Sequence, residues 1–138
     1  MSDDEVWEAV KALLLTAPGF KGQHVYDDDE VPGSNGNPGT LPPAFAVLSV
    51  ERRYVPPNRQ GGTARVGYRA AVRHVGTTAT NARRVGKWVQ DALESSPGRG
   101  KKITVGGVKS TAITHESTNA VAKDGTEHSG LSQWTLAL

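Results

Sequence analysis

Three arginines recur at four-residue spacing near the middle of the chain. Arg65, Arg69 and Arg73 alternate with apolar residues, and side chains four positions apart project from the same face of a β-strand. Like charges on one strand face repel one another and require water, carboxylates or phosphates as partners. Three interpretations follow: a solvated sheet face, salt bridges to a neighbouring subunit, or contact with the phosphates of a nucleic acid.

Two further charged groups lie outside this segment. One is basic and consists of Arg83, Arg84 and Lys87, whereas the other is the acidic run Asp27-Asp28-Asp29-Glu30. The acidic run does not match a calcium-binding EF-hand loop, because Val31-Pro32 stands where that loop needs a third ligand and a glycine. We therefore expect a solvated edge strand or turn there.

The motifs of common enzyme classes are incomplete in this sequence. Residues 32–36, Pro-Gly-Ser-Asn-Gly, lack the first glycine of a hydrolase nucleophile elbow. Residues 95–102 end in Gly-Lys-Lys without the flanking residues of a phosphate-binding loop, and they precede a predicted strand where that loop needs a helix. The histidines show no spacing typical of a metal site. The sequence thus predicts no catalytic, cofactor-binding or metal-binding residue, and a protein that is not an enzyme.

Hydrophobic periodicity predicts two helices that must position the charged segments. Ser2 and Glu5 form a capping box before an apolar stripe that ends at Pro18-Gly19. A second helix follows Gly76-Thr77-Thr78, and its apolar residues recur at three- and four-residue spacing up to Leu93. Each apolar stripe requires a sheet to pack against.

The strands are predicted to form a mixed, mainly antiparallel sheet against these helices, which gives an α+β fold. The apolar segment 44–55 and the arginine-bearing segment are close enough in sequence to pair as a hairpin, and the middle of 44–55 should be buried on both faces. Later strands are predicted at 103–105, 108–115 and 133–138, with Gly106-Gly107 as a turn or bulge.

The remaining segments are predicted to be irregular. Residues 33–43 are rich in glycine and proline, residues 116–128 are polar, and we expect both to be flexible loops. Residues 95–102 are expected to form a turn. With 138 residues the chain fits one domain, 1–138, with a single core.

Composition limits the partners and the compartment. The net charge is only +2, so the whole chain gives no strong argument for a polyanionic partner. The absence of cysteine fits assembly in a reducing cytoplasm and excludes disulfides and thiolate chemistry. The longest apolar run near the N-terminus, Ala12 to Leu15, is too short for a signal peptide or a membrane span. We expect no membrane partner.

Three segments together resemble the tail terminator proteins of long-tailed bacteriophages: His24 to Pro32, Pro43 to Val50 and Tyr68 to Leu93. In that family a short N-terminal helix precedes a strand that enters an acidic turn and a proline. An apolar strand, an arginine-bearing strand, a second helix and closing strands follow. The resemblance covers most of the chain.

This resemblance implies a ring-forming subunit of the virion, assembled in the host cytoplasm. It implies a homo-hexamer that caps the head-proximal end of the tail tube protein, stops tube growth and meets the head-completion or connector proteins of the neck. DNA would pass through the lumen without sequence-specific binding, and no cofactor would be needed. The charged groups become candidates for subunit-interface or lumen positions: Arg65, Arg69, Arg73, Arg83, Arg84, Lys87, Asp27, Asp28, Asp29 and Glu30.

Two alternatives stay open at this point. One is another neck or tail component, such as a head-completion protein or a tube subunit. The other is a small nucleic-acid-binding module, although no aromatic residue falls clearly on the arginine face to stack against bases. Phosphate contact is therefore compatible with the sequence, whereas base recognition is not expected.

Overall fold

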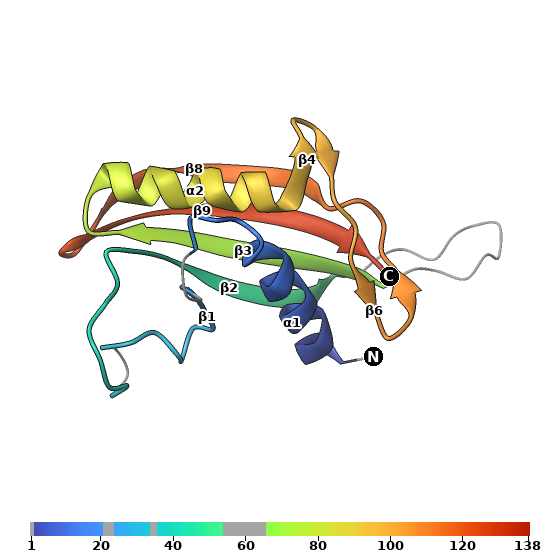
Figure 1. The fold of residues 1–138 in the computed structure, drawn as a ribbon, viewed down its shortest axis with the longest axis horizontal. Helices are drawn as coiled ribbons and strands as arrows, with labels where there is room; N and C mark the ends of the chain where they lie inside the picture. The colour runs from blue at the N-terminus through green and yellow to red at the C-terminus, as the bar shows by residue number, and fades with distance from the viewer. Residues whose placement is uncertain (1, 21–23, 34–35, 54–65) are drawn as a thin grey trace.

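A five-stranded sheet carries two helices on one of its faces (Figure 1). The computed structural model describes residues 2–20, 24–33, 36–53 and 66–138. The sheet order is β1 (Val25–Tyr26), β2 (Ala44–Arg53), β3 (Gly67–Gly76), β9 (Glu127–Ala137) and β8 (Thr114–Asp124). β1 runs parallel to β2, and every other neighbouring pair in this sheet is antiparallel. The predicted α+β class is confirmed.

The first helix, α1 (Asp3–Leu14), begins at the predicted cap and is attached to an edge of the sheet. Ser2 accepts a hydrogen bond from the Glu5 backbone N–H at 3.2 Å. The helix ends at Leu14, before the predicted Pro18-Gly19 stop. On its buried side, Trp7 Nε1 donates to the Leu48 carbonyl at 2.8 Å. Because β1 pairs only as far as Val47, the indole satisfies the next carbonyl of β2.

The second helix, α2 (Ala79–Leu93), starts after a tight turn from β3. Thr78 caps it by accepting from the Asn81 backbone N–H at 3.1 Å. A Cβ added at Gly76 would lie 2.5 Å from the Ala82 nitrogen, so the turn requires glycine at this position. Its buried residues are Ala82, Val85, Val89, Ala92 and Leu93, which is the predicted apolar stripe.

The main core lies between the helices and the sheet. It contains the buried strand residues Leu48, Tyr68, Ala70, Val72, Trp134 and Leu136. A smaller cluster of Val31, Phe45, Val47 and Val75 lies on the opposite face. Of the predicted segment 44–55, residues 54 and 55 lie outside the described residues. β2 is buried on both faces only near its start, because its later residues are mostly exposed. Val66 continues the apolar alternation of the arginine-bearing segment in the sequence, but it lies outside β3 and is 41% exposed.

Two small hairpins follow α2. The first joins β4 (Glu94–Ser96) to β5 (Arg99–Gly100) within the predicted turn 95–102. The second joins β6 (Thr104–Val105) to β7 (Val108–Lys109), and its turn is the predicted Gly106-Gly107 pair. Both glycines have positive φ, +56° and +82°, which residues with a side chain rarely adopt.

The prediction of an irregular segment at 116–128 is wrong. These residues belong to β8 and β9, and Gly125, with φ of +64°, is the first residue of the two-residue turn between them. β8 is almost entirely exposed, since it is an edge strand that no helix covers. Its polar composition therefore reflects its position in the sheet. Residues 36–43 contain no helix and only the turns expected of the predicted loop 33–43, whose flexibility stays a prediction.

Replacing Trp7 by phenylalanine should destabilise the protein by about 1–3 kcal/mol, because the buried Leu48 carbonyl then loses its donor. The matched control is Trp88→Phe, since the half-buried Trp88 ring packs edge to face on Phe20 and makes no hydrogen bond within the described chain. Urea unfolding of both variants measures the difference. Equal losses of stability would contradict a specific role for the indole N–H.

Candidate functional site

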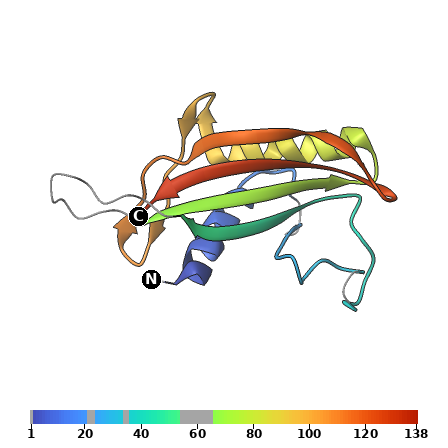
Figure 2. The same ribbon diagram turned by 180° about the vertical axis from the view of Figure 1, so that it is seen from behind.

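Arg69 and Arg73 of β3 lie on the sheet face that neither helix covers. Figure 2 views the molecule from the side of this face. Arg69 pairs in register with Glu51 of β2 and Thr135 of β9, and Arg73 pairs with Val47 and Leu131. Arg65 belongs to the same predicted set but lies outside the described residues. The predicted shared face is therefore confirmed for two of the three arginines.

Carboxylates of the same chain neutralise Arg69. Its Nη2 lies 2.8 Å from Glu116 Oε1 and its Nε lies 3.3 Å from Oε2, while Nη1 lies 3.4 Å from Glu51. Glu116 also lies 3.7 Å from Arg53. The hydrogen bond to Glu116 is the main cause that raises the pKa of Arg69 above its usual value. This ion-pair cluster joins β2, β3 and β8. The sequence did not indicate that Arg69 forms salt bridges within its own chain.

Arg73 differs from Arg69 in its surroundings. It is exposed, its cross-strand neighbours Val47 and Leu131 are apolar, and it makes no ion pair within the described chain. The described aromatic side chains beside this face include His24, Tyr26 and Phe45, and the Tyr26 ring stacks on His24 and packs edge to face against Phe45. Phe45 is buried and the half-buried Tyr26 already contacts both neighbours, so this group is not an open row of rings of the kind that stacks the bases of single-stranded nucleic acids.

The acidic turn, residues Asp27 to Glu30, follows β1 at one edge of the sheet. Oxygens of Asp27, Asp29 and Glu30 lie within 4.8 Å of one another, and none of these three side chains has an ion pair within the described residues. The Asn37 side-chain amide donates to the Asp29 carbonyl at 2.6 Å and holds the turn. Exposed carboxylates at such spacing also occur without a cation, so we assign no metal.

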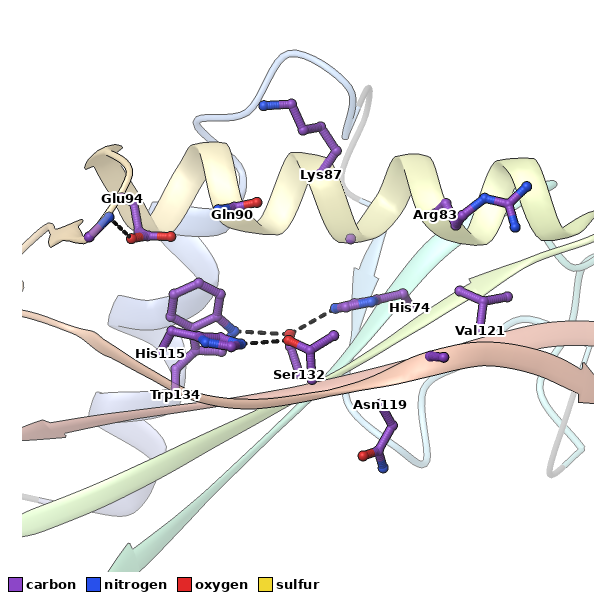
Figure 3. A pocket seen from close by; sticks show the side chains of 14 residues that line it. His74, Arg83, Lys87, Gln90, Glu94, His115, Asn119, Val121, Ser132 and Trp134 are labelled. Carbon is purple, nitrogen blue, oxygen red and sulfur yellow. Dashed lines mark hydrogen bonds between the residues drawn. The ribbon is translucent and has the colours of Figure 1, made fainter.

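A cleft of about 770 Å³ lies between α2 and the edge strand β8 (Figure 3). The helix packs on β3 and β9, and β8 presents mostly small or polar side chains that do not fill the space below it. Arg83, Lys87, Gln90 and Glu94 line the helix side at one residue per turn. No pattern in the sequence indicates this cleft, because the cleft depends on which strands become neighbours.

A buried hydrogen-bonded network forms the floor of the cleft. Ser132 Oγ accepts from Trp134 Nε1 at 2.9 Å and lies 2.8 Å from His74 Nε2. Desolvation lowers the pKa of His74 from 6.5 to about 4, so the ring is neutral at pH 7. His115 packs edge to face on Trp134 at 4.9 Å. His74 is a residue of β3, and its burial has no signal in the spacing of the histidines.

The close approach of Ser132 and His74 is also what a nucleophile and its base require. Here, however, both side chains are buried, and the indole N–H already occupies Ser132 Oγ. A histidine with a pKa near 4 is a weak base at neutral pH. No carboxylate of the described chain hydrogen-bonds the His74 ring to orient it. The geometry favours a structural network.

Some of the charged side chains that line the cleft have an ion-pair or hydrogen-bond partner in the described chain, and Arg83 has no ion pair there. Lys87 Nζ lies 2.8 Å from Asp91, and Glu94 accepts from the Gly98 backbone N–H at 2.8 Å. Arg83 lines the cleft, is exposed and has no ion pair among the described residues. Arg84 is also exposed and unpaired there, but it does not line the cleft.

The predicted charged residues do not meet in one site. The acidic turn lies beside β1 at one edge of the sheet, the cleft with Arg83 and Lys87 lies at the opposite β8 edge, and Arg69 and Arg73 lie between them on the uncovered face. Three separate surfaces therefore carry the candidate residues. Within the described residues, neither helix has the length and apolar character needed to cross a bilayer.

Comparison with known proteins gives matches in structure only. No protein-family model and no curated sequence matches the chain. A chain from the virion of a native gene transfer agent particle aligns with a TM-score of 0.66 and 17% identity, over 96% of this chain and 92% of that one. A second solved structure, which carries no functional description, aligns with a TM-score of 0.62 and 15% identity, over 99% and 95%. At these identities the likeness shows a shared fold.

Acidification should destabilise the protein through His74. A pKa near 4 in the folded state and 6.5 in the unfolded state means that stability is complete above pH 6.5 and is lost as the pH falls toward 4, by about 3 kcal/mol. The His74→Gln variant has no titrating group at this position. The free energy of unfolding of the wild type, minus that of the variant, should therefore decrease as the pH falls from 6.5 to 4. A constant difference from pH 7.5 to pH 4.5 would contradict the proposed desolvation.

Proposed function

We propose that the chain is a structural virion protein, a tail terminator that caps the head-proximal end of a tail tube. The observation that carries this proposal is the likeness in fold, over nearly the full length of both chains, to a chain of a gene transfer agent virion. The sequence resemblance to tail terminators supports it independently. In this function the subunit forms a hexameric ring, ends tube polymerisation and provides the surface that joins the tail to the head.

The distribution of charge supports a ring subunit. Closing a ring requires two different surfaces on each subunit, one of which meets the other surface of the next copy. The acidic turn lies beside β1, whereas the basic residues Arg83 and Lys87 of α2 line the cleft at the β8 edge, so unlike surfaces face opposite edges of one sheet. Such surfaces attract between copies and repel when like meets like, which favours head-to-tail contact.

The proposed partners follow from the position of the ring. They are the tail tube protein on one side and the head-completion or connector proteins of the neck on the other. DNA would pass through the lumen without base recognition, and Arg73 is the described arginine on the uncovered face whose charge remains available to phosphates. The protein would need no cofactor and perform no reaction, since the Ser132 and His74 pair is arranged as a structural network.

Another neck or tail component, either a head-completion protein or a tube subunit, is the second candidate. The same fold likeness favours it, because the matched chain is described only as part of a virion. A small nucleic-acid-binding module has less support, since Arg69 is neutralised by Glu116 and Glu51. That class predicts retention on phosphate-bearing columns with a steep salt dependence.

Imaging of particles produced without this chain distinguishes these functions. A terminator that is missing leaves tube growth unchecked, so we expect overlong tails that are separate from full heads. Complementation with the wild-type chain should restore uniform tails joined to heads. Normal joined particles would overturn the proposed function. Absent tails would indicate a tube subunit, and tails of normal length beside unjoined heads would indicate a head-completion protein.

A further inference from the structure

We propose that the cleft between α2 and β8 binds the acidic turn, Asp27 to Glu30, of a second copy of this chain. The proposal rests on the proposed ring function and identifies the residues of its subunit contact. It concerns a surface that the sequence did not reveal, because the cleft exists only once β8 takes the edge position beside β9.

The cleft provides an available positive charge at one end. Arg83 lines it from α2 without an ion pair in the described chain, whereas Lys87 is held by Asp91. At the other end Glu94 accepts from the backbone of the following turn. Figure 3 shows Val121 rising from β8 beside Arg83, which gives the basic end a partly apolar wall. An acidic segment therefore fits the Arg83 end and is excluded from the Glu94 end.

The acidic turn provides the complementary group. Its three clustered carboxylates repel one another, and their side chains have no ion pair within the described chain. Hydrogen bonds from Asn37 to the carbonyls of Asp29 and Val31 fix the backbone of the turn. A turn that is already ordered loses little conformational freedom on binding. A guanidinium from another copy would relieve the repulsion and form charge-assisted hydrogen bonds.

The topology prevents the two surfaces of one copy from meeting. β1 and β8 are the opposite edges of the sheet, and β2, β3 and β9 lie between them. The contact must therefore join the turn of one copy to the cleft of the next. This contact is heterologous, and repeated contacts of this kind close into a ring when the rotation between copies allows.

The arginines of the uncovered face fit this contact less well. Arg69 already has two carboxylate partners, and a competing acidic turn would have to displace Glu116 from a two-point contact. Arg73 is available, but it lies on the open sheet face and does not line a cleft. A concave surface excludes more water from an ion pair than an open face does, which strengthens the attraction.

The test is a charge exchange measured by sedimentation equilibrium of the purified chain. Arg83→Glu in the cleft, and Asp29→Lys with Glu30→Lys in the turn, should each lower the self-association constant roughly tenfold or more, because like charges then face each other. An equimolar mixture of the two variants should recover association. Each copy in the mixture can bind the opposite variant through both of its surfaces.

Two control variants separate this contact from a general effect of charge. Arg84→Glu changes the same net charge on the same helix outside the cleft, and Arg73→Glu changes it on the uncovered face. Both should associate as the wild type does. Equal loss in either control, failure of the mixture to recover, or a wild-type chain that stays monomeric would overturn the proposed contact.

The outcome is independent of the particle experiment. Association that is unaffected by Arg83→Glu would remove the cleft contact and leave the terminator function standing. Recovery in the mixture, combined with normal joined particles in the absence of the chain, would preserve the contact and remove the terminator function.

Discussion

The apolar stripe of α2 packs on β3 and β9, and this contact determines which surfaces of the molecule remain open. A helix placed over the centre of the sheet covers Val72 and Trp134 but leaves the edge strand β8 without a layer above it. The cleft results directly from that placement. No helix of the described residues covers the opposite face, where the small cluster near the acidic turn is the buried apolar part and Arg69 and Arg73 are exposed to partners or solvent to different degrees.

The charged side chains on the remaining surfaces differ in whether they are free to bind a partner molecule. Within the described chain, Glu116 and Glu51 neutralise Arg69, and Asp91 neutralises Lys87. The side chains of Arg73, Arg83 and the clustered carboxylates Asp27, Asp29 and Glu30 make no ion pair there. Exposed ion pairs add little to stability. Their main consequence here is that the paired charges are less available to bind a partner molecule, whereas the unpaired ones remain available. Net charge, which is only +2, hides this separation.

The sequence predicted those parts of the fold that depend on local pattern. The alternation in β3, the apolar stripe of α2 and the Gly106-Gly107 turn each follow from neighbouring residues. β8 could not be recognised in the same way, because a fully exposed edge strand has no buried face to impose alternation. The hairpin signal at Gly125 was the one local indication. The buried His74 network and the Arg69 ion pairs required knowledge of strand order.

The edge strand β8, which the sequence did not predict, also affects how copies of the chain can associate. An exposed edge invites any strand to pair with it, and register irregularities between Asn119 and Ala122 interrupt the regular ladder of β8. Such irregularities disfavour indiscriminate pairing along the strand. A contact that relies on the cleft beside β8, and on an acidic turn of fixed shape, is in contrast specific in position and orientation. In the ring that we propose, specificity of this kind matters more than the strength of any single ion pair.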